Sequence, residues 1–265
     1  MANEQTLKED LSSEKEFFDK YYVESRDRGP DPEMATYIRK ATQPSSRPVD
    51  YWEYAFYLVG DLRNKKVLDV ACGGGWITRL LALKGAAVTG FDISLEGCKT
   101  TRKKLQESGL NGSSLSVVDA HSISFKDNSF DVVFATGALH HLNIAKVASE
   151  VHRVLKPGGK FVCYEPLKYG PLMWAIKQAW LRMKGLQDHD TTEHEEGLAV
   201  ADFAPFEKLF ASGFVRPFNF VAKTNRLKKR FGPLAESLRW TDYLLLSALP
   251  FLRRYCTCAV VCFVK

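Results

Sequence analysis

The sequence predicts an α/β protein built on one doubly wound, mostly parallel sheet, and two observations support this prediction. From Lys66 onward, short β-rich runs alternate with segments of helical period, which is typical of sheets with helices on both faces. The strand runs are continuously apolar, as expected for strands buried on both faces. The chain has 265 residues, 45% of them hydrophobic and 26% charged, so it is long enough for one large domain with a full core.

Seven apolar runs are expected to form the strands of this sheet. In chain order they occupy 66–71, 87–93, 115–120, 130–137, 160–166, 214–224 and 255–265. The last two runs are expected to form an antiparallel pair that closes one edge.

Helices are expected between these strands, at 76–85, 95–109, 145–159 and 203–213. The first two end at Gly85 and Gly109, as helix C-termini commonly do. The third is expected to end at the Pro-Gly-Gly of 157–159. Its apolar stripe consists of Val147, Val151, Val154 and Leu155.

Domain organisation follows from the segments outside the alternating pattern. Residues 1–60 look helical and rich in aromatic side chains, and they are predicted to form a lid over a main domain at 61–265. Two insertions in the main domain, at about 168–200 and 226–254, contain apolar, aromatic helical stretches. Because such insertions lie above the strand ends, they are expected to cap a ligand pocket.

Several classes of protein are disfavoured by composition. The opening stretch MANEQTLKEDLSSEKEFF is polar and shows no secretory signal pattern, so a cytoplasmic protein is expected. Six cysteines lie in apolar segments without zinc-type spacing, so buried reduced thiols are expected, with no disulfide and no structural metal. The stretch DHDTTEHEE at 188–196 gathers histidines and acids, but nothing fixes a ligand geometry, and a solvated loop is preferred over a metal site.

Sheets of this kind bind ligands outside the carboxyl ends of their strands, where the strand order reverses. The residues expected at those ends are 69–75, Asp92, Asp119 with Ala120, Thr136 with Gly137, and Glu165 with Pro166. Acids recur among them, and no Lys or Arg joins them. The sequence therefore predicts an acidic rim around a glycine-rich turn.

This rim argues against a nicotinamide or flavin dinucleotide. A pyrophosphate favours a bare helix N-terminus and is repelled by nearby carboxylates. Counted from Gly73 and Gly75, the third glycine of G-x-G-x-x-G would fall at position 78, which is Thr78. A cofactor with a positive centre, a free amine and a ribose diol, but no phosphate, suits the rim better, and S-adenosylmethionine is such a cofactor.

Four stretches together carry a resemblance to a known family: VLDVACGGGW, VTGFDIS, VVDAHSISFKDNSFDVVFATGALHHL and EVHRVLKPGGKFVCYEP. In this order, across about 65–166, they resemble the class I S-adenosylmethionine-dependent methyltransferases, particularly the small-molecule branch with quinone-biosynthesis and natural-product enzymes. The resemblance implies a Rossmann-like fold and methyl transfer from S-adenosylmethionine. One position departs from the family loop D-x-G-x-G-x-G, because Ala71 stands at its first glycine, a small-for-small change.

The resemblance also implies roles at a cofactor site. Asp69 would support the methionine end of the cofactor, beside the loop of Ala71, Gly73 and Gly75. Asp92 would accept hydrogen bonds from both ribose hydroxyls. The other implied contacts are Ile93 on the adenine face, Asp119 and Ala120 on the adenine edge, Thr136 near the sulfonium, and Trp76 beside the methionine portion.

Each of these roles has a simpler structural alternative. Asp92 or Asp119 alone could cap a following helix. The glycines could serve only the tight turn, and Trp76 could be a core residue.

Catalytic candidates follow the fourth and fifth strands. A hydroxyl or acidic C–H acceptor must lose a proton, and His140 or His141 could remove it, although a loop-shaping role for His141 is slightly preferred. Glu165 is a second candidate base. Tyr21 and Tyr22 are expected to close over the cofactor from the lid.

The acceptor is expected to be a small, largely apolar molecule, because both insertions are aromatic-rich. Between Arg216 and Lys265 there are ten bases and two acids, so a peripheral contact with an anionic membrane stays open beside a solvated basic edge. Two alternatives are a nucleic-acid methyltransferase and a non-catalytic cofactor-binding protein. No nucleic-acid partner is expected, since the bases are not interleaved with stacking aromatics, and the intact acidic rim gives no sign of a lost site.

Overall fold

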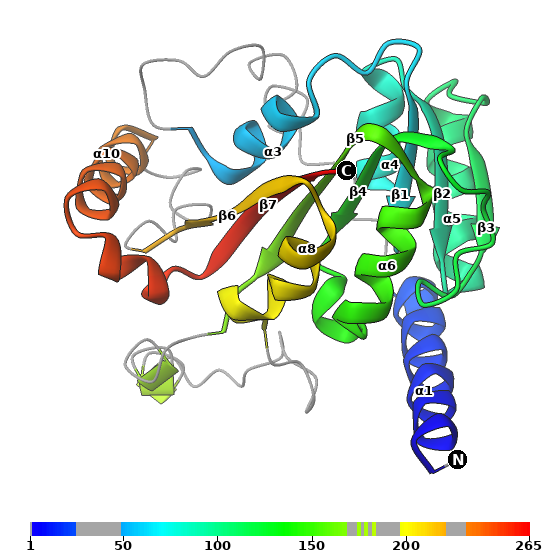
Figure 1. The fold of residues 1–265 in the computed structure, drawn as a ribbon, viewed down its shortest axis with the longest axis horizontal. Helices are drawn as coiled ribbons and strands as arrows, with labels where there is room; N and C mark the ends of the chain where they lie inside the picture. The colour runs from blue at the N-terminus through cyan, green and yellow to red at the C-terminus, as the bar shows by residue number, and fades with distance from the viewer. Residues whose placement is uncertain are drawn as a thin grey trace.

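The computed structural model describes residues 2–24, 49–168, 197–220 and 232–265, with three short pieces at 174–175, 178–179 and 182–183. Seven strands form one twisted sheet in the order β3-β2-β1-β4-β5-β7-β6 (Figure 1). They are β1 (Lys66–Val70), β2 (Ala87–Asp92), β3 (Ser114–Val117), β4 (Phe130–Thr136), β5 (Leu155–Pro166), β6 (Ser212–Phe218) and β7 (Cys258–Val264). The first five pair in parallel, and β7 is antiparallel to both β5 and β6. The predicted fold class is confirmed.

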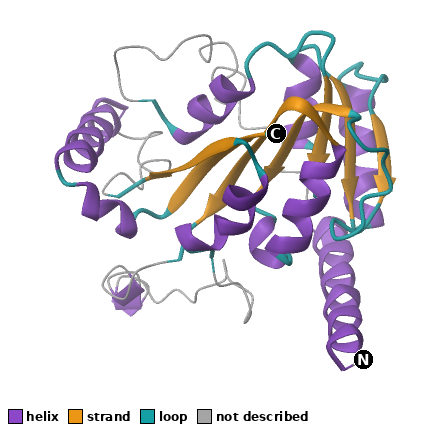
Figure 2. Cartoon of the chain, viewed as in Figure 1, coloured by secondary structure: helices purple, strands orange, loops and turns teal. Residues whose placement is uncertain are grey.

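Helices cover both faces of the sheet (Figure 2). They are α1 (Ala2–Glu24), α3 (Tyr51–Val59), α4 (Trp76–Leu83), α5 (Leu95–Glu107), α6 (Ile144–Val154), α8 (Ala204–Leu209) and α10 (Gly232–Ala248), with short 3-10 turns η1 (Leu139–His141), η2 (Val200–Phe203) and η3 (Pro250–Tyr255). Successive strand residues point to opposite faces. Val133 accordingly packs in the core under α6 and α8, whereas Val132 and Phe134 pack in the core under α3 and α4.

Helix α3 belongs to the core and not to a lid. Asp50 caps its first turn by accepting hydrogen bonds from the backbone N–H groups of Trp52 and Glu53, which fixes where the helix begins. Phe56 and Ala55 are fully buried against the sheet. The lid predicted for residues 1–60 is therefore reduced, within the described part of that segment, to α1.

Two predicted boundaries differ from the structure. The predicted helix at 145–159 ends at Val154, and Leu155 already begins β5, where the register with β4 shifts and accommodates the Pro-Gly-Gly sequence as an irregularity. The stripe itself is confirmed, because Val147, Val151 and Val154 are fully buried. The strand predicted at 214–224 is β6 at Ser212–Phe218.

All six cysteines are buried, as expected for apolar segments. Among the described helices, none is long and apolar enough to cross a membrane.

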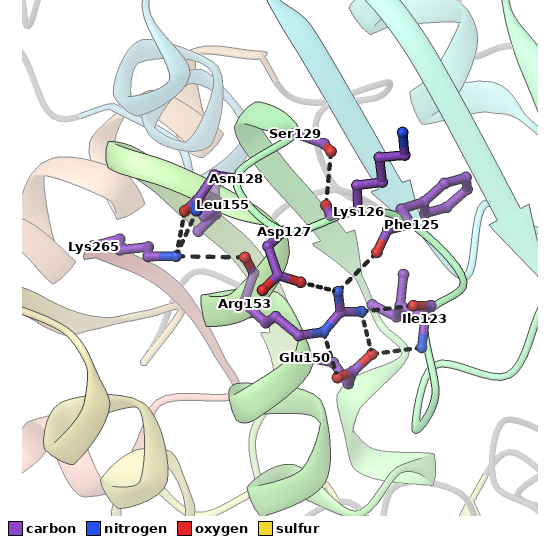
Figure 3. Close-up of polar contacts among 10 residues, drawn as sticks. All are labelled: Ile123, Phe125, Lys126, Asp127, Asn128, Ser129, Glu150, Arg153, Leu155 and Lys265. Atoms are coloured by element: carbon purple, nitrogen blue, oxygen red, sulfur yellow. Dashed lines mark hydrogen bonds and ion pairs between the residues drawn. The ribbon is translucent and has the colours of Figure 1, made fainter.

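Arg153, at the end of α6, ties the long loop before β4 to the body of the protein (Figure 3). Its guanidinium donates to the carbonyl oxygens of Ile123 and Phe125, at 2.7 and 2.8 Å, and to the carboxylate of Asp127 at 2.7 Å. It also forms a two-pronged contact with Glu150 at 2.8 and 2.9 Å. These hydrogen bonds hold the pKa of Glu150 below its ordinary value. One planar side chain therefore fixes the segment that follows β3.

Replacing Arg153 with lysine is expected to lower the free energy of unfolding by about 1–2 kcal/mol, because an ammonium group cannot reproduce the planar fork that reaches several acceptors at once. Urea denaturation measures the change. Arg102→Lys is the matched control, since Arg102 is exposed on α5. An equal loss of stability in the two variants would show that Arg153 does not hold the loop before β4 in place.

Candidate active site

The carboxyl ends of β1, β2, β4 and β5 lie side by side at one edge of the sheet. The register places Val70 beside both Phe91 and Ala135, and Thr136 beside Tyr164. From β1 the chain crosses to β2 on one side, while β4 pairs on the other. This is the switch point at which open α/β sheets bind ligands.

The glycine-rich turn after β1 runs through left-handed backbone conformations. Ala71, Gly73 and Gly75 have φ values of 52°, 51° and 76°. A Cβ atom on Gly75 would lie 2.5 Å from the Thr101 side chain, so only glycine fits there. Thr101 Oγ1 also donates to the Gly73 carbonyl oxygen at 2.7 Å. Ala71, which stands where the family has glycine, therefore carries a conformation that disfavours a side chain.

Asp92 organises the turn from the end of β2. Its Oδ2 atom accepts the Gly73 backbone N–H and its Oδ1 atom accepts the Ser94 backbone N–H, both at 2.8 Å. The residue is 6% exposed, and burial raises the pKa of its carboxyl. The N-cap of α5 is Ser94, whose hydroxyl accepts from the Gly97 backbone N–H. The structure therefore shows Ser94, and not Asp92, as the N-cap of α5.

Asp69 lies beneath the turn, in the interior. It is 1% exposed, and its Oδ2 atom accepts a hydrogen bond from Thr78 Oγ1 at 2.6 Å. Burial raises the pKa of Asp69 to about 7. Thr78 stands where a dinucleotide-binding loop would have its third glycine. Its hydroxyl holds the carboxyl group of Asp69 in place.

The turn after β3 is held by a pair that sequence reasoning missed. Asp119 Oδ1 accepts from both the backbone N–H and the Nδ1 atom of His121, at 2.8 and 2.7 Å. His121 Nε2 in turn accepts the Asn143 backbone N–H at 2.9 Å, which places the ring proton on Nδ1. In the sequence, the only indication of this pair was that His121 follows Asp119 by two residues. Ala120 is 6% exposed and Ile93 is half-buried.

Glu165 joins β5 to the turn after β4. It is fully buried. Its Oε1 atom accepts the backbone N–H groups of Ala138 and Leu139 at 2.9 Å, and its Oε2 atom lies 2.8 Å from His140 Nδ1. Both oxygens of this fully buried side chain hold groups of the protein, so Glu165 orients His140. With Nδ1–H donating to Glu165, His140 Nε2 is left as an acceptor.

The neighbouring His141 faces helix α1. Its Nδ1 atom lies 3.4 Å from Glu14 Oε1, and its ring meets Phe18 edge-on at 5.6 Å. Thr136, at the end of β4, carries a buried hydroxyl with no hydrogen-bond partner among the described residues. A buried, unsatisfied hydroxyl at a strand end costs free energy, and a bound ligand would relieve that cost.

Helix α1 contacts this edge of the sheet with its C-terminal half, and its N-terminal half projects away from the molecule (Figure 1). Asp19 accepts hydrogen bonds from Ser94 Oγ at 2.5 Å and from the Glu96 backbone N–H at 3.1 Å. The Tyr22 ring lies so close to the turn that a Cβ atom on Gly73 would collide with its hydroxyl. Burial and the charge of Asp92 raise the pKa of Tyr22.

Of the two tyrosines expected to close over the cofactor, Tyr21 is 52% exposed, whereas Tyr22 packs on the turn. Trp76 is half-buried, with its ring 5.7 Å from that of Trp52. The centre of the Trp52 ring lies in turn 4.9 Å from that of the Tyr164 ring. An aromatic row therefore extends from the glycine-rich turn along the face of the sheet that α3 covers.

Some predicted features lie elsewhere. The stretch 188–196 and most of the first insertion are outside the described residues. In the described part of the chain, no group of three or more His, Cys, Asp or Glu side chains could hold a metal ion. Phe203, at the start of the segment predicted as a helix at 203–213, is fully buried in the core.

Relief of the backbone strain at Ala71 is expected to stabilise the folded protein. Ala71→Gly is expected to raise the free energy of unfolding by about 0.5–1 kcal/mol, because glycine adopts a positive φ without a Cβ penalty. The control is Ala87→Gly, at an exposed position in β2 with ordinary strand backbone, where the same change should destabilise. Thermal unfolding measures the change in stability for both variants. Destabilisation by Ala71→Gly would show that the backbone at Ala71 is not strained.

The raised pKa of Asp69 predicts a pH dependence of stability. The folded protein holds its proton up to about pH 7, while the unfolded chain releases it near pH 4. Stability is therefore lost as pH rises from about 4 to about 7. Asp69→Asn removes this loss, so the variant should gain about 2 kcal/mol relative to wild type between pH 5 and pH 7.5. Parallel denaturation profiles of the two proteins would show that Asp69 does not titrate in this window.

Comparisons with known proteins find methyltransferases. Residues 68–163 match the family described as methyltransferase domain. A sterol 4-C-methyltransferase of Caenorhabditis elegans is 35% identical over 107 residues, 40% of this chain and 32% of that protein. A ubiquinone biosynthesis O-methyltransferase of Nitrosomonas europaea is 29% identical over 181 residues, 66% of this chain and 77% of that protein. In the first three distinct curated relatives, the matched region spans between 32% and 58% of their own length.

Solved structures show the same fold at low identity. Phospholethanolamine N-methyltransferase 2 of Haemonchus contortus, in complex with phosphomonomethylethanolamine and S-adenosylhomocysteine, is 18% identical with a TM-score of 0.52, covering 88% of this chain and 56% of that one. The [4+2]-cyclase SpnF is also 18% identical, with a TM-score of 0.54 and coverage of 88% and 93%. The fold alone therefore does not define the reaction. Together with the ordered motifs, however, the matches show that residues 68–163 form a methyltransferase domain, with S-adenosylmethionine as its methyl donor.

Proposed function

We propose that this protein transfers the methyl group of S-adenosylmethionine to a small, largely apolar acceptor. The observation that carries the proposal is the arrangement at the switch point. A left-handed glycine turn is bonded to the Asp92 carboxylate, and the buried Thr136 hydroxyl beside it lacks a partner among the described residues. Such a cradle favours a ligand with a diol and a positive centre over a pyrophosphate.

The residues of the turn fit such a donor, and we assign them roles on that basis. Asp92 would accept from the ribose hydroxyls while it continues to hold Gly73. Gly73 and Gly75 would let the backbone approach the methionine portion, and Trp76 would flank it. Asp69 is buried and bonded to Thr78, so it would support the turn from beneath without contacting the donor. Ile93, Asp119 and Ala120 would surround the adenine.

The donor supplies an electrophilic methyl group on a sulfonium. The protein's task is to align the acceptor atom with that methyl group, since in-line displacement depends on positioning. Thr136 and the turn at 138–141 would form the floor of the reaction site. His140 Nε2, oriented by Glu165, would accept the proton of a hydroxyl acceptor. Helix α1, which contacts both the turn and His141, would exclude water from above.

The acceptor class rests on the relatives and on the apolar character of the cap. Three matched proteins are named sterol 4-C-methyltransferase, phthiotriol/phenolphthiotriol dimycocerosates methyltransferase and ubiquinone biosynthesis O-methyltransferase, and sterols and dimycocerosates have large apolar bodies. A peripheral membrane contact through α10 and η3 is part of the same hypothesis. Leu244, Phe251 and Leu249 are exposed there beside exposed Arg253 and Arg254, as an interfacial contact requires.

Incubation of the full chain with methyl-labelled S-adenosylmethionine and a lipid-containing cell extract tests the proposal. Label is expected in small molecules that partition into organic solvent. A heat-denatured sample is the control. Label recovered only in RNA or protein would contradict the small-molecule acceptor, and tight donor binding without any transfer would identify a non-catalytic binding protein.

The two adjacent histidines are expected to differ in their effect on turnover. If the labelled product is an O-methyl ether, His140→Gln should lower kcat by about 100-fold with donor affinity nearly unchanged, as loss of a general base does. His141→Gln is the control, because His141 contacts α1 and lacks the Glu165 partner. Full activity in His140→Gln, or a larger loss in His141→Gln, would reverse the assignment.

A further inference from the structure

A cavity of about 350 Å³ lies at the β6 edge of the sheet. Residues from the start of α3, from β6, from α10 and from η3 line it. In Figure 1, α10 and β6 occupy the side of the sheet away from α1. Four strand spacings separate β6 from β1, or roughly 19 Å at about 4.8 Å each. The cavity is therefore distinct from the donor site, and its volume is at the lower end of small-molecule sites, about 300–1,000 Å³.

The lining combines apolar rings with an excess of positive charge. Tyr51, Phe214, Tyr243 and Leu246 supply apolar surface, and Arg216, Arg239, Arg253, Asp50 and Asp242 supply the charges. A ligand with an apolar body and a charged end would match both parts of the wall.

The two acids already serve the fold. Asp50 caps α3, accepting from the Trp52 and Glu53 backbone N–H groups at 2.8 and 3.3 Å. Asp242 accepts the Phe220 backbone N–H at 3.1 Å. Both carboxylates are buried, at 6% and 7% exposure. Hydrogen bonds from backbone N–H groups spread part of their charge, so the cavity favours an anion over a cation.

Arg216 offers the free donors for that anion. Its Cζ atom lies 4.4 Å from the centre of the Tyr54 ring and 5.2 Å from that of Phe218. Apart from these ring contacts, the Arg216 side chain makes no hydrogen bond or ion pair to the residues that the structure describes. The in-plane N–H groups therefore remain available, in the fork that matches two oxygens of a carboxylate or phosphate.

We infer that this cavity is a second binding site, which takes the anionic end of an amphipathic small molecule, a carboxylate or phosphate monoester on an apolar chain. Arg216 binds the anionic oxygens, and the tyrosine, phenylalanine and leucine side chains of the wall receive the chain. The inference does not depend on methyl transfer, because the donor and the site at the glycine turn take no part in this binding.

Calorimetric titration of the full chain, without S-adenosylmethionine, tests the site with three probes of equal chain length: decanoate, decyl phosphate and decanol. At least one anionic probe is expected to bind about tenfold or more tightly than decanol, and the tighter of the two identifies the preferred anion. Arg216→Gln should reduce that affinity to the level of decanol. Arg216→Lys, which keeps the charge but loses the fork, should give an intermediate value.

Arg102→Gln is the control, because Arg102 is exposed on α5 and does not line the cavity. It should bind the anionic probes as wild type does. Circular dichroism and the unfolding temperature check that each variant is folded. Absence of binding by both anionic probes, equal affinity for decanol, or undiminished affinity in folded Arg216→Gln would overturn the inference.

Discussion

The hydrogen bond from the Gly73 backbone N–H to Asp92 is the interaction on which the candidate active site depends. It joins the turn after β1 to the end of β2, and it holds the turn in left-handed conformations that most residues avoid. Thr101 fills the space that a side chain on Gly75 would need. The same carboxylate organises the start of α5 through Ser94. One buried acid thus sets the shape of the cradle and supplies its negative charge.

Three buried acids at this edge of the sheet each hold a different segment in place. They are Asp69 of β1, Asp92 of β2 and Glu165 of β5. Asp69 bonds to Thr78 within the first crossover, and Glu165 fixes the turn that carries the histidines. Each carboxylate is buried with hydrogen-bond donors around it, which limits the cost of removing a charge from water. Helix α1 contacts this edge through Asp19, which bonds to Ser94, and through Tyr22, which packs on Gly73.

Much of the fold could be predicted because the strand and helix patterns are strong. Apolar runs at Val67 or Val132 admit few alternatives to a buried strand, and the stripe ending at Val154 fixed the face of α6. The contacts that cross the chain could not be predicted. Nothing in the sequence says that Thr78 would bond to Asp69, that His121 would bind Asp119, or that Tyr22, instead of Tyr21, would face the turn. These depend on rotation about helix axes and on loop paths, which the tertiary packing decides. Helix α3 was misplaced for the same reason, since its aromatic residues suit a lid and a core equally well.

The central claim is that the carboxylate-lined turn binds S-adenosylmethionine and not a dinucleotide. Calorimetric titration of the full chain with S-adenosylmethionine and with NAD tests it most directly. The account predicts saturable binding of S-adenosylmethionine, no binding of NAD, and a loss of about 1.5–3 kcal/mol in donor affinity for folded Asp92→Ala. Binding of NAD without S-adenosylmethionine, or an unchanged donor affinity in Asp92→Ala, would contradict it.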